Sequence, residues 1–190
     1  MEIAIVGGGI GGPALALALH DAGFDDVEVY ESTPAVKELG VGINVMPHAV
    51  HELAELGLLD DLTAVGIPTA EFVLSSKHGQ RIWGEPRGPA AGYRWPQISI
   101  HRGELLGVLY RAVLARLGPA RVHTGHHLTR FGQAGDRVWA EFVDRARDAA
   151  VGRGEADLLV GCDGIHSVVR RDASPRHGVR MWAASVTAGV

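Results

Sequence analysis

Three glycines near the start of the chain have the spacing of a phosphate-binding turn. Gly7, Gly9 and Gly12 form the pattern Gly-x-Gly-x-x-Gly, and Glu31 follows nineteen residues after the last of them. In such a turn the first glycine permits a tight bend, the second lets a pyrophosphate approach the backbone, and the third lets a helix pack closely on a sheet. Unpaired amides and the positive end of the helix dipole then bind the phosphates. A carboxylate at Glu31 would accept hydrogen bonds from the adenosine ribose, so the pattern predicts a dinucleotide site.

The same residues leave the identity of the dinucleotide open. Glu31 would repel a 2′-phosphate at close range, which disfavours NADP at this position. NAD and FAD are both compatible with the pattern. A glycine-rich turn without a ligand is much less favoured, because the pattern lies between a predicted strand and a predicted helix, as its function requires.

Two further features are ambiguous when they are read from the residues alone. Asp163 and Gly164 follow an apolar strand, and Asp163 would lie at the carboxyl end of that strand, where open α/β sheets bind ligands. An Asp that caps a strand-to-helix turn explains the same pattern equally well. Arg102 opens a long predicted helix and has the reach to bind a phosphate, although an arginine at this spacing is more often a surface residue.

Two groups of histidines have residue types that bind metals but lack an enforced set of ligands. One group lies on the polar face of a predicted helix, and the other lies next to a predicted turn. We therefore predict no metal site. The groups are His48, His51, Glu52 and Glu55, and His123, His126 and His127.

The elements that must position these residues alternate between strands and helices. A strand over 2–6, a helix over 10–22 and a strand over 27–31 form a βαβ unit, which requires parallel strands and a right-handed crossover. The segments 32–46 and 84–96 are rich in glycine or proline and are predicted to be loops. The remaining predictions are helices over 47–56 and 102–117, a hairpin with strands 71–76 and 80–83, strands over 97–100, 121–124, 127–131, 137–143 and 157–160, and a short helix bearing Arg170 and Arg171.

Composition limits the classes of protein to consider. The chain has 190 residues, of which 46% are hydrophobic and 21% charged, enough for one domain and part of a second. A net charge of −4 without a basic run argues against binding to nucleic acid or to a membrane surface. The single cysteine, Cys162, excludes an internal disulfide and is compatible with a reducing cytoplasm, where we expect the protein. The uncharged segment 3–19 is divided by glycines and Pro13, so we do not interpret it as a membrane span or signal peptide.

These motifs in this order resemble the FAD-dependent aromatic-ring monooxygenases of the para-hydroxybenzoate hydroxylase type. The glycine turn with Glu31 matches the first FAD motif of that family, and Asp163-Gly164 matches its Asp-Gly motif. The segments 39–48 and 95–105 look closer still to the 5-methylphenazine-1-carboxylate 1-monooxygenase branch. The resemblance implies an α/β fold, namely a Rossmann-like FAD/NAD(P)-binding domain with a parallel sheet, helices and a smaller antiparallel β piece.

The resemblance also implies an activity and a set of cofactor contacts. The activity would be hydroxylation of a small aromatic substrate with FAD, O₂ and NAD(P)H as a transient electron donor. The resemblance implies no particular catalytic residue in this chain. The implied contacts are Gly7, Gly9 and Gly12 with the FAD pyrophosphate, Glu31 with the adenosine ribose, the Leu128 backbone with adenine, Gly42 and Ile43 with the isoalloxazine, Arg102 with the ribityl–pyrophosphate region, and Asp163 in the motif shared between FAD and the nicotinamide donor.

The end of the chain departs from the family pattern. We expect a FAD-binding domain over 1–182, with the start of the substrate-domain sheet at 69–100, and an aberrant or truncated tail over 183–190. The tail is apolar and strand-prone, which predicts self-association through it. Two alternatives to an active monooxygenase stay open at this point, a FAD-binding remnant without activity and an NAD-dependent dehydrogenase.

Overall fold

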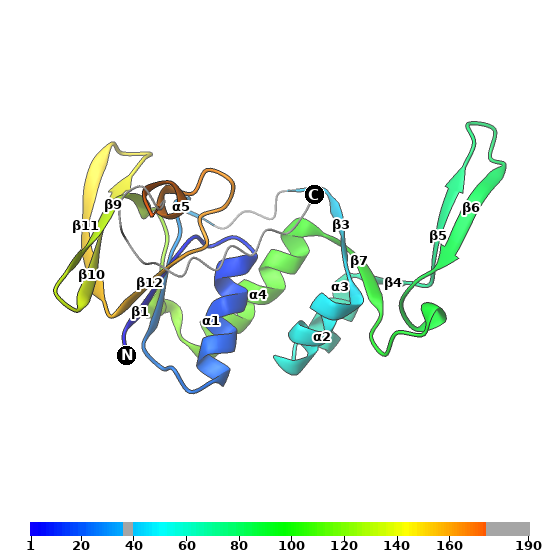
Figure 1. Ribbon diagram of the computed structural model, residues 1–190, viewed down its shortest axis with the longest axis horizontal. Coiled ribbons are helices and arrows are strands. Elements are labelled where there is room, and N and C mark those ends of the chain that lie inside the picture. Colours follow the sequence, from blue (N-terminus) through cyan, green and yellow to red (C-terminus); the bar gives the residue numbers. More distant parts are fainter. Residues whose placement is uncertain (36–39, 174–190) are drawn as a thin grey trace. The chain divides into compact units, whose positions relative to one another are not determined.

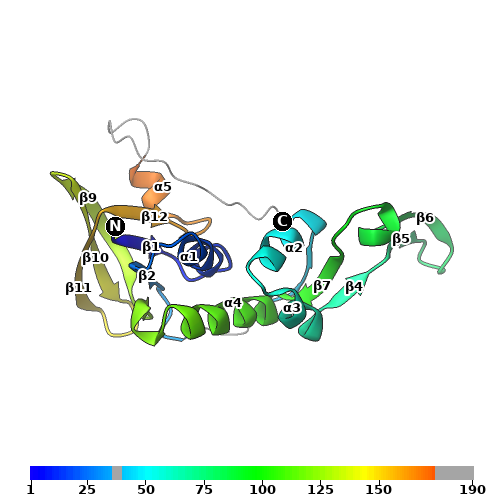
Figure 2. The same cartoon turned by 90° about the horizontal axis from the view of Figure 1, so that it is seen from below.

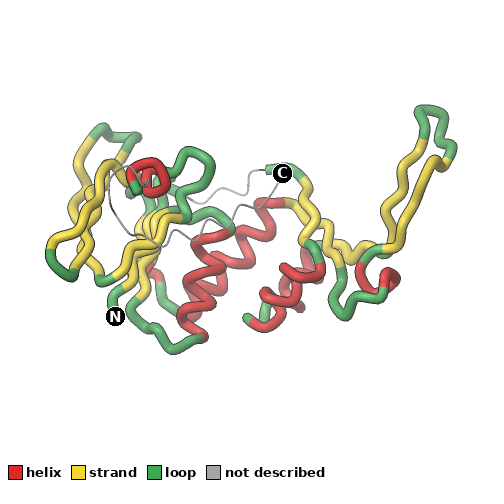
Figure 3. Tube along the Cα trace, in the orientation of Figure 1, coloured by secondary structure: helices red, strands yellow, loops and turns green. Residues whose placement is uncertain are grey.

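The computed structural model describes residues 1–35 and 40–173, which belong to two compact units (Figure 1). The first unit comprises Met1–Lys37 and Leu109–Val190, and the second comprises Glu38–Val108. Each unit has sheets of its own, which the strand colouring of Figure 3 makes easy to follow. The predicted tail over 183–190 lies outside the described residues.

A four-stranded parallel sheet forms the centre of the first unit. Its order is β12-β1-β2-β8, and each neighbouring pair is parallel. Helix α1 connects β1 to β2 and packs on both strands, so the predicted βαβ unit is confirmed. The elements are β1 (Ile3–Val6), α1 (Gly11–Asp21), β2 (Val27–Tyr30), β8 (Val122–His123) and β12 (Leu158–Gly161).

The two faces of this sheet are covered by different layers, as Figure 2 shows. Alternate residues of a strand point to opposite faces. Ile3 and Ile5, at 1% and 0% exposure, therefore share a face, and α1 packs on β1. Val6 and Tyr30 belong to a cluster with Phe142 of a three-stranded antiparallel sheet. That sheet has the order β11-β10-β9 and contains β9 (His127–Ala134), β10 (Arg137–Asp144) and β11 (Ala149–Ala156).

The second unit is built on a small antiparallel sheet in the order β3-β7-β4. Helices α2 and α3 pack on β7, and the core contains Val50, Leu62 and Ile98, each fully buried. A separate two-stranded hairpin, β5-β6, follows β4 along the chain. The elements are β3 (Gly42–Val45), α2 (Pro47–Glu55), α3 (Leu59–Val65), β4 (Ile67–Thr69), β5 (Glu71–Ser75), β6 (Arg81–Pro86), the 3₁₀ turn η1 (Gly88–Ala91) and β7 (Gln97–His101).

Three further elements complete the fold. Helix α4 (Arg102–Arg116) follows β7 directly and provides residues to both units, because the boundary falls at Leu109. The 3₁₀ turn η2 (Pro119–Arg121) precedes β8, and α5 (Val168–Asp172) follows β12 and packs on β12 and β9. None of the helices in the described part of the chain is long and apolar enough to cross a membrane.

The structure corrects the predicted loops. The segment 32–46 was expected to be a loop but contains β3, whose partner β7 is distant in sequence. The segment 84–96 begins within β6 and contains η1. Elements α3, β4 and β11 were not predicted.

Candidate functional site

The glycine turn between β1 and α1 is packed tightly, both against the backbone that follows β12 and against itself. Gly7 has a φ of 114°, and a β-carbon on it would lie 2.2 Å from the carbonyl oxygen of Cys162. A β-carbon on Gly12 would lie 1.9 Å from the carbonyl oxygen of Gly7. Both positions therefore require glycine, as the sequence pattern predicted.

Gly9, by contrast, faces open space. A β-carbon on Gly9 would meet no atom within 4 Å, and this residue lines a cleft. Helix α1 begins two residues later, with Ile10 at its N-cap, and the Ile10 side chain makes no capping hydrogen bond. The amino end of α1 and the bare backbone at Gly9 thus offer hydrogen-bond donors to an anion.

Glu31 follows β2 directly and is held beside the glycine turn. Its Oε2 accepts a hydrogen bond from the Gly8 amide at 2.6 Å. Its Oε1 accepts hydrogen bonds from the Thr33 amide at 2.7 Å and the Ser32 hydroxyl at 3.1 Å. These bonds orient the carboxylate next to the predicted pyrophosphate position, whereas its contact with a ribose stays a prediction.

Tyr110 of α4 lies behind the turn and was not identified from the sequence. A β-carbon on Gly8 would lie 2.1 Å from the Tyr110 hydroxyl and 2.8 Å from Oε2 of Glu31, so all three groups are close. Within the described part of the chain this buried hydroxyl has no hydrogen-bond partner. Burial, and then the charge of Glu31, raise the pKa of Tyr110 above its ordinary value.

Asp163 lies at the carboxyl end of β12, as predicted, and its carboxylate caps α5. The Ser167 hydroxyl donates to Oδ1, and the amides of Val168 and Val169 donate to Oδ2 at 2.7 and 3.2 Å. The capping interpretation therefore describes what this side chain does in the structure. Its place in a motif shared between FAD and the nicotinamide donor stays a prediction.

Cys162 contributes its backbone and an unreactive thiol to the same region. Its carbonyl oxygen faces Gly7, and its amide donates to the Val6 carbonyl at 2.6 Å. Burial, and then the charge of Asp163, raise the pKa of the Cys162 thiol to about 11. The thiol is therefore protonated at neutral pH and is a poor nucleophile.

Leu128 lies at an irregularity in β9. Phe142 of β10 pairs with Leu128, but Glu141 pairs with Arg130, so the register skips Thr129. Leu128 itself is 2% exposed, and both Leu128 and Thr129 line the cleft. A bulge of this kind frees backbone groups that a regular ladder would use, which is compatible with the predicted contact between this backbone and adenine.

One cleft of about 680 Å³ in the first unit brings most of the predicted residues together. Its lining includes Gly7, Gly9, Glu31, Leu128 and Asp163, whereas Gly12 lies beneath the turn. Arginine side chains add positive charge, and arginine and histidine side chains add hydrogen-bonding groups. These basic residues are His126, His127, Arg145, His166 and Arg171. The glycine cradle, the open helix end and the carboxylate fit the adenosine diphosphate portion of a dinucleotide.

The other three predicted contact residues lie together in the second unit. Gly42 pairs with His101, and Ile43 pairs with Ile100. The amide of Arg102 donates to the Val41 carbonyl at 3.0 Å, which holds the start of α4 beside β3. The Arg102 side chain is exposed. Contact between these residues and the same cofactor stays a prediction.

The two histidine groups do not form metal sites in the described residues, where no set of three or more His, Cys, Asp or Glu side chains is arranged to hold an ion. His51 lies within 3.6 Å of carboxylate oxygens of Glu52 and Glu55 on its own helix. This arrangement is that of a polar helix face.

Comparison with known proteins decides between the dinucleotides that the glycine turn leaves open. The family profile described as "FAD binding domain" matches residues 1–188. The chain belongs to this family. Within it, the chain is 45% identical over 174 residues to phenazine 1,6-dicarboxylic acid hydroxylase PhzS of Lysobacter antibioticus, covering 92% of this chain and 43% of the relative. It is also 35% identical over 171 residues to 2,6-dihydroxypyridine 3-monooxygenase of Paenarthrobacter nicotinovorans, covering 90% of this chain and 38% of the relative.

Solved structures agree with this membership. The 2,6-dihydroxypyridine-3-hydroxylase from Arthrobacter nicotinovorans is 32% identical, with a TM-score of 0.69 over 92% of this chain and 39% of that chain. An HpxO variant of Klebsiella pneumoniae complexed with FAD is 29% identical, with a TM-score of 0.71 over 90% of this chain and 41% of that chain. The Rossmann-like α/β fold and the FAD cofactor are thus confirmed for this FAD binding domain. The chain spans less than half the length of these relatives.

Proposed function

We propose that this FAD binding domain serves a monooxygenase that hydroxylates a small aromatic substrate with NAD(P)H and O₂. The observation that carries the proposal is the cleft at the amino end of α1, with Gly9 open to it and Glu31 fixed beside it. Membership in the FAD-binding family and the hydroxylases among the relatives support the same reaction.

The residues of the cleft would divide the adenosine diphosphate of FAD between them. The backbone of Gly7 and Gly9 and the amino end of α1 bind the pyrophosphate. Glu31 accepts hydrogen bonds from the ribose, and the backbone at Leu128 contacts adenine. When bound, FAD supplies the redox chemistry, because it takes electrons from NAD(P)H and activates O₂.

The proposal extends to the flavin end of the cofactor through the second unit. Gly42 and Ile43 would lie along the isoalloxazine, and Arg102 would bind the ribityl–pyrophosphate region. Arg102 is suited to this role because its guanidinium is exposed and has no ion pair within the described part of the chain. The segment 69–100 would begin the sheet that covers the substrate.

The proposed substrate is an aromatic acid. The relatives include proteins named for phenazine 1,6-dicarboxylic acid, 3-amino-4-hydroxybenzoate, 6-hydroxynicotinate and salicylate. All of these names describe aromatic rings that carry carboxylates. We therefore propose a carboxylated ring, with phenazine acids as the first compounds to test.

Cofactor identification and turnover on the purified chain test this function. We expect a yellow protein that releases FAD on denaturation and oxidises NAD(P)H faster when an aromatic acid is added. Uptake of NAD with no FAD bound at saturating flavin would overturn the proposal. FAD binding without any substrate-stimulated oxidation would instead indicate a flavin-binding remnant.

A further inference from the structure

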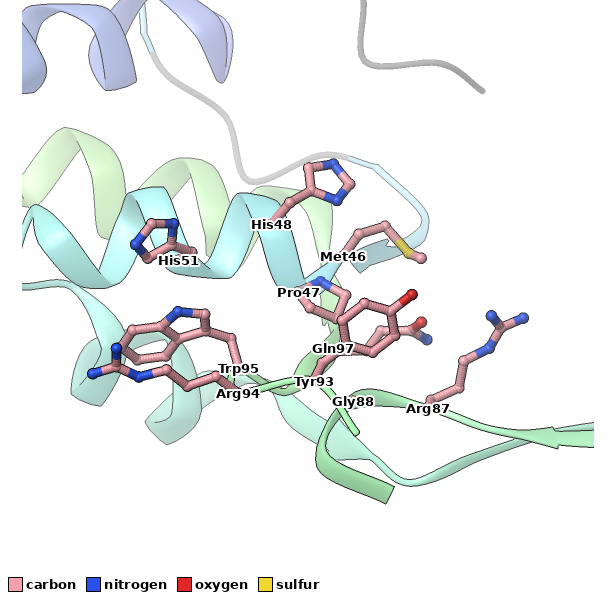
Figure 4. A pocket seen from close by; sticks show the side chains of 10 residues that line it. All are labelled: Met46, Pro47, His48, His51, Arg87, Gly88, Tyr93, Arg94, Trp95 and Gln97. Atoms are coloured by element: carbon pink, nitrogen blue, oxygen red, sulfur yellow. The ribbon is translucent and has the colours of Figure 1, made fainter. Parts of the chain in front are cut away.

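The second unit contains a cavity of its own, of about 240 Å³. Figure 4 shows side chains from α2 and from the loop before β7 around it, among them His48, His51, Tyr93 and Trp95. All of its lining residues belong to the second unit. The volume is below the range of about 300–1,000 Å³ typical of drug-sized sites, so the cavity suits a small ring system.

A side-chain amide faces this cavity. Gln97, the first residue of β7, is 5% exposed and lines the cavity, yet its side chain bonds to none of the described residues. Side-chain amides in proteins usually bond to a protein group or to ordered water. A ligand with a polar substituent would satisfy this amide.

Flat ring surfaces border the same space. The rings of Trp95 and His51 stack with centroids 5.6 Å apart and an angle of 25° between their planes. Tyr93 is 61% exposed, and its hydroxyl has no hydrogen bond to the described residues. Aromatic rings in such positions favour planar ligands, which stack on them at little entropic cost.

The charge of the lining is positive. Arg87 and Arg94 contribute to it, and no aspartate or glutamate belongs to the lining. Arg87 forms an ion pair with Glu85, but Arg94 has no carboxylate partner among residues 1–35 and 40–173 and lies 5.1 Å from the Trp95 ring. An anion would therefore find a guanidinium that lies on an aromatic ring and has no carboxylate partner in the described structure.

We propose that this cavity binds a planar aromatic carboxylate, with the ring against Tyr93 and the carboxylate on Arg94. Gln97 donates to, or accepts from, a polar atom of the ring or its substituent. The inference rests on the proposed function, since the ligand that it describes is the aromatic acid to be hydroxylated. It adds the location of the site within the second unit and the side chains that select an acid over a neutral ring.

Calorimetric titration of the whole 190-residue chain with 1-naphthoate and with the neutral 1-naphthamide tests the site. We expect Arg94→Gln to weaken naphthoate binding by roughly tenfold, since a charged hydrogen bond is lost, and to leave naphthamide binding unchanged. Gln97→Met, which keeps the side-chain length, should weaken both compounds. Arg147→Gln removes an exposed arginine of the first unit and serves as the matched control.

The titration overturns the site if naphthoate does not bind to the unmodified chain. It also overturns the site if the Arg94→Gln and Gln97→Met variants bind naphthoate as tightly as the unmodified chain does. Circular dichroism and thermal unfolding of each variant confirm that a loss of binding is not a loss of folding. A second replacement, Arg94→Lys, keeps the charge and should restore much of the naphthoate affinity.

FAD uptake measured on the same samples separates this inference from the proposed function. A folded chain that binds FAD but not naphthoate overturns the cavity proposal alone. A folded chain that binds naphthoate but not FAD overturns the proposed function alone. A folded chain that binds neither overturns both.

Discussion

Gly9 and Gly12 are both glycines of the turn, but their α-carbons have different surroundings. A β-carbon on Gly9 would enter open space in the cleft, whereas one on Gly12 would overlap the Gly7 carbonyl. We predict that Gly9→Glu abolishes FAD uptake with little change in the free energy of unfolding, because the new carboxylate occupies and repels the pyrophosphate position. Gly12→Ala should lower the free energy of unfolding by about 1–3 kcal/mol. Flavin fluorescence and urea unfolding measure the two effects.

A charge added elsewhere provides the control for Gly9→Glu. Ala134 is exposed at the end of β9 and does not line the cleft, so Ala134→Glu should bind FAD as the unmodified chain does. Normal FAD uptake by Gly9→Glu would show that the pyrophosphate does not lie on this turn, and the monooxygenase proposal would lose its main support.

The hydroxyls of Tyr110 and Tyr30 allow a matched comparison of an unpaired and a paired buried group. Tyr110 has no hydrogen-bond partner in the described structure, whereas Tyr30 donates to Oε2 of Glu28 at 2.6 Å. Removing a hydrogen-bonded buried hydroxyl costs about 1 kcal/mol, and removing an unpaired one costs little or stabilises. We therefore expect Tyr30→Phe to lower the free energy of unfolding and Tyr110→Phe to leave it unchanged or raise it. A loss of 1 kcal/mol or more in Tyr110→Phe would mean that its hydroxyl has a partner.

The Cys162 thiol should titrate at a much higher pH in the folded chain than in the unfolded chain. Its folded-state pKa is raised to about 11 by burial and by Asp163, whereas a free thiol has a pKa of about 8.5. Because the raised pKa favours the neutral thiol, its contribution to stability is complete below the unfolded pKa and is lost as the pH rises toward 11. The iodoacetamide alkylation rate, followed against pH with and without urea, measures both values. A native midpoint near that of the unfolded chain would contradict the burial of this thiol.

At the scale of elements, two side chains cap α5, namely the Asp163 carboxylate and the Ser167 hydroxyl, which accepts a hydrogen bond from the Arg170 amide at 2.8 Å. Asp163 accepts hydrogen bonds from the amides of Val168 and Val169 and from the Ser167 hydroxyl. Replacing a capping Asp by Ala costs about 0.5–2 kcal/mol, so Asp163→Ala should lower the free energy of unfolding and speed hydrogen exchange at the two valine amides. Asp172→Ala, at the carboxyl end of the same helix, should have no such effect. Equal protection of both amides in Asp163→Ala would contradict the capping role.

The elements that the sequence predicted are those whose signals are local. The βαβ unit and the β5-β6 hairpin have hydrophobic periods and turn residues within one short segment, and both are confirmed. Strand β3 was missed because it lies in a glycine-containing segment and pairs with a strand more than fifty residues away. Strand β11 was missed because it contains two glycines and is exposed over most of its length, so it lacks an alternating pattern. Helix α3 is short, and only its acidic first turn marks it.

The candidate site follows the same division between local and distant signals. Gly7, Gly9, Gly12 and Glu31 were predictable because one turn and its neighbouring strand contain them all. The contact of Tyr110 with this turn joins residues about a hundred positions apart, and no spacing rule records it. The cavity around Gln97 was likewise hidden, because it combines a helix face with a segment predicted to be a loop.

At the scale of the whole molecule, the β5-β6 hairpin leaves apolar side chains in contact with water. Leu74, Ile82 and Trp83 are 47%, 69% and 47% exposed, and the hairpin pairs with no further strand in the described structure. Two-stranded sheets are marginally stable alone, and unpaired apolar strands tend to associate. The net charge of −4 offers only modest repulsion between copies.

We therefore predict that the chain self-associates through this hairpin and that Ile82→Lys shifts it toward the monomer, because a charge on the strand blocks pairing with a second copy. Sedimentation velocity over a range of concentrations measures the shift. Leu114→Lys, which adds the same charge to an exposed apolar position of α4, is the control and should associate as the unmodified chain does. A chain shortened to residue 173 tests the rival source, the apolar tail. If the shortened chain is monomeric while Ile82→Lys still associates, the contact lies in the tail and the hairpin prediction is wrong.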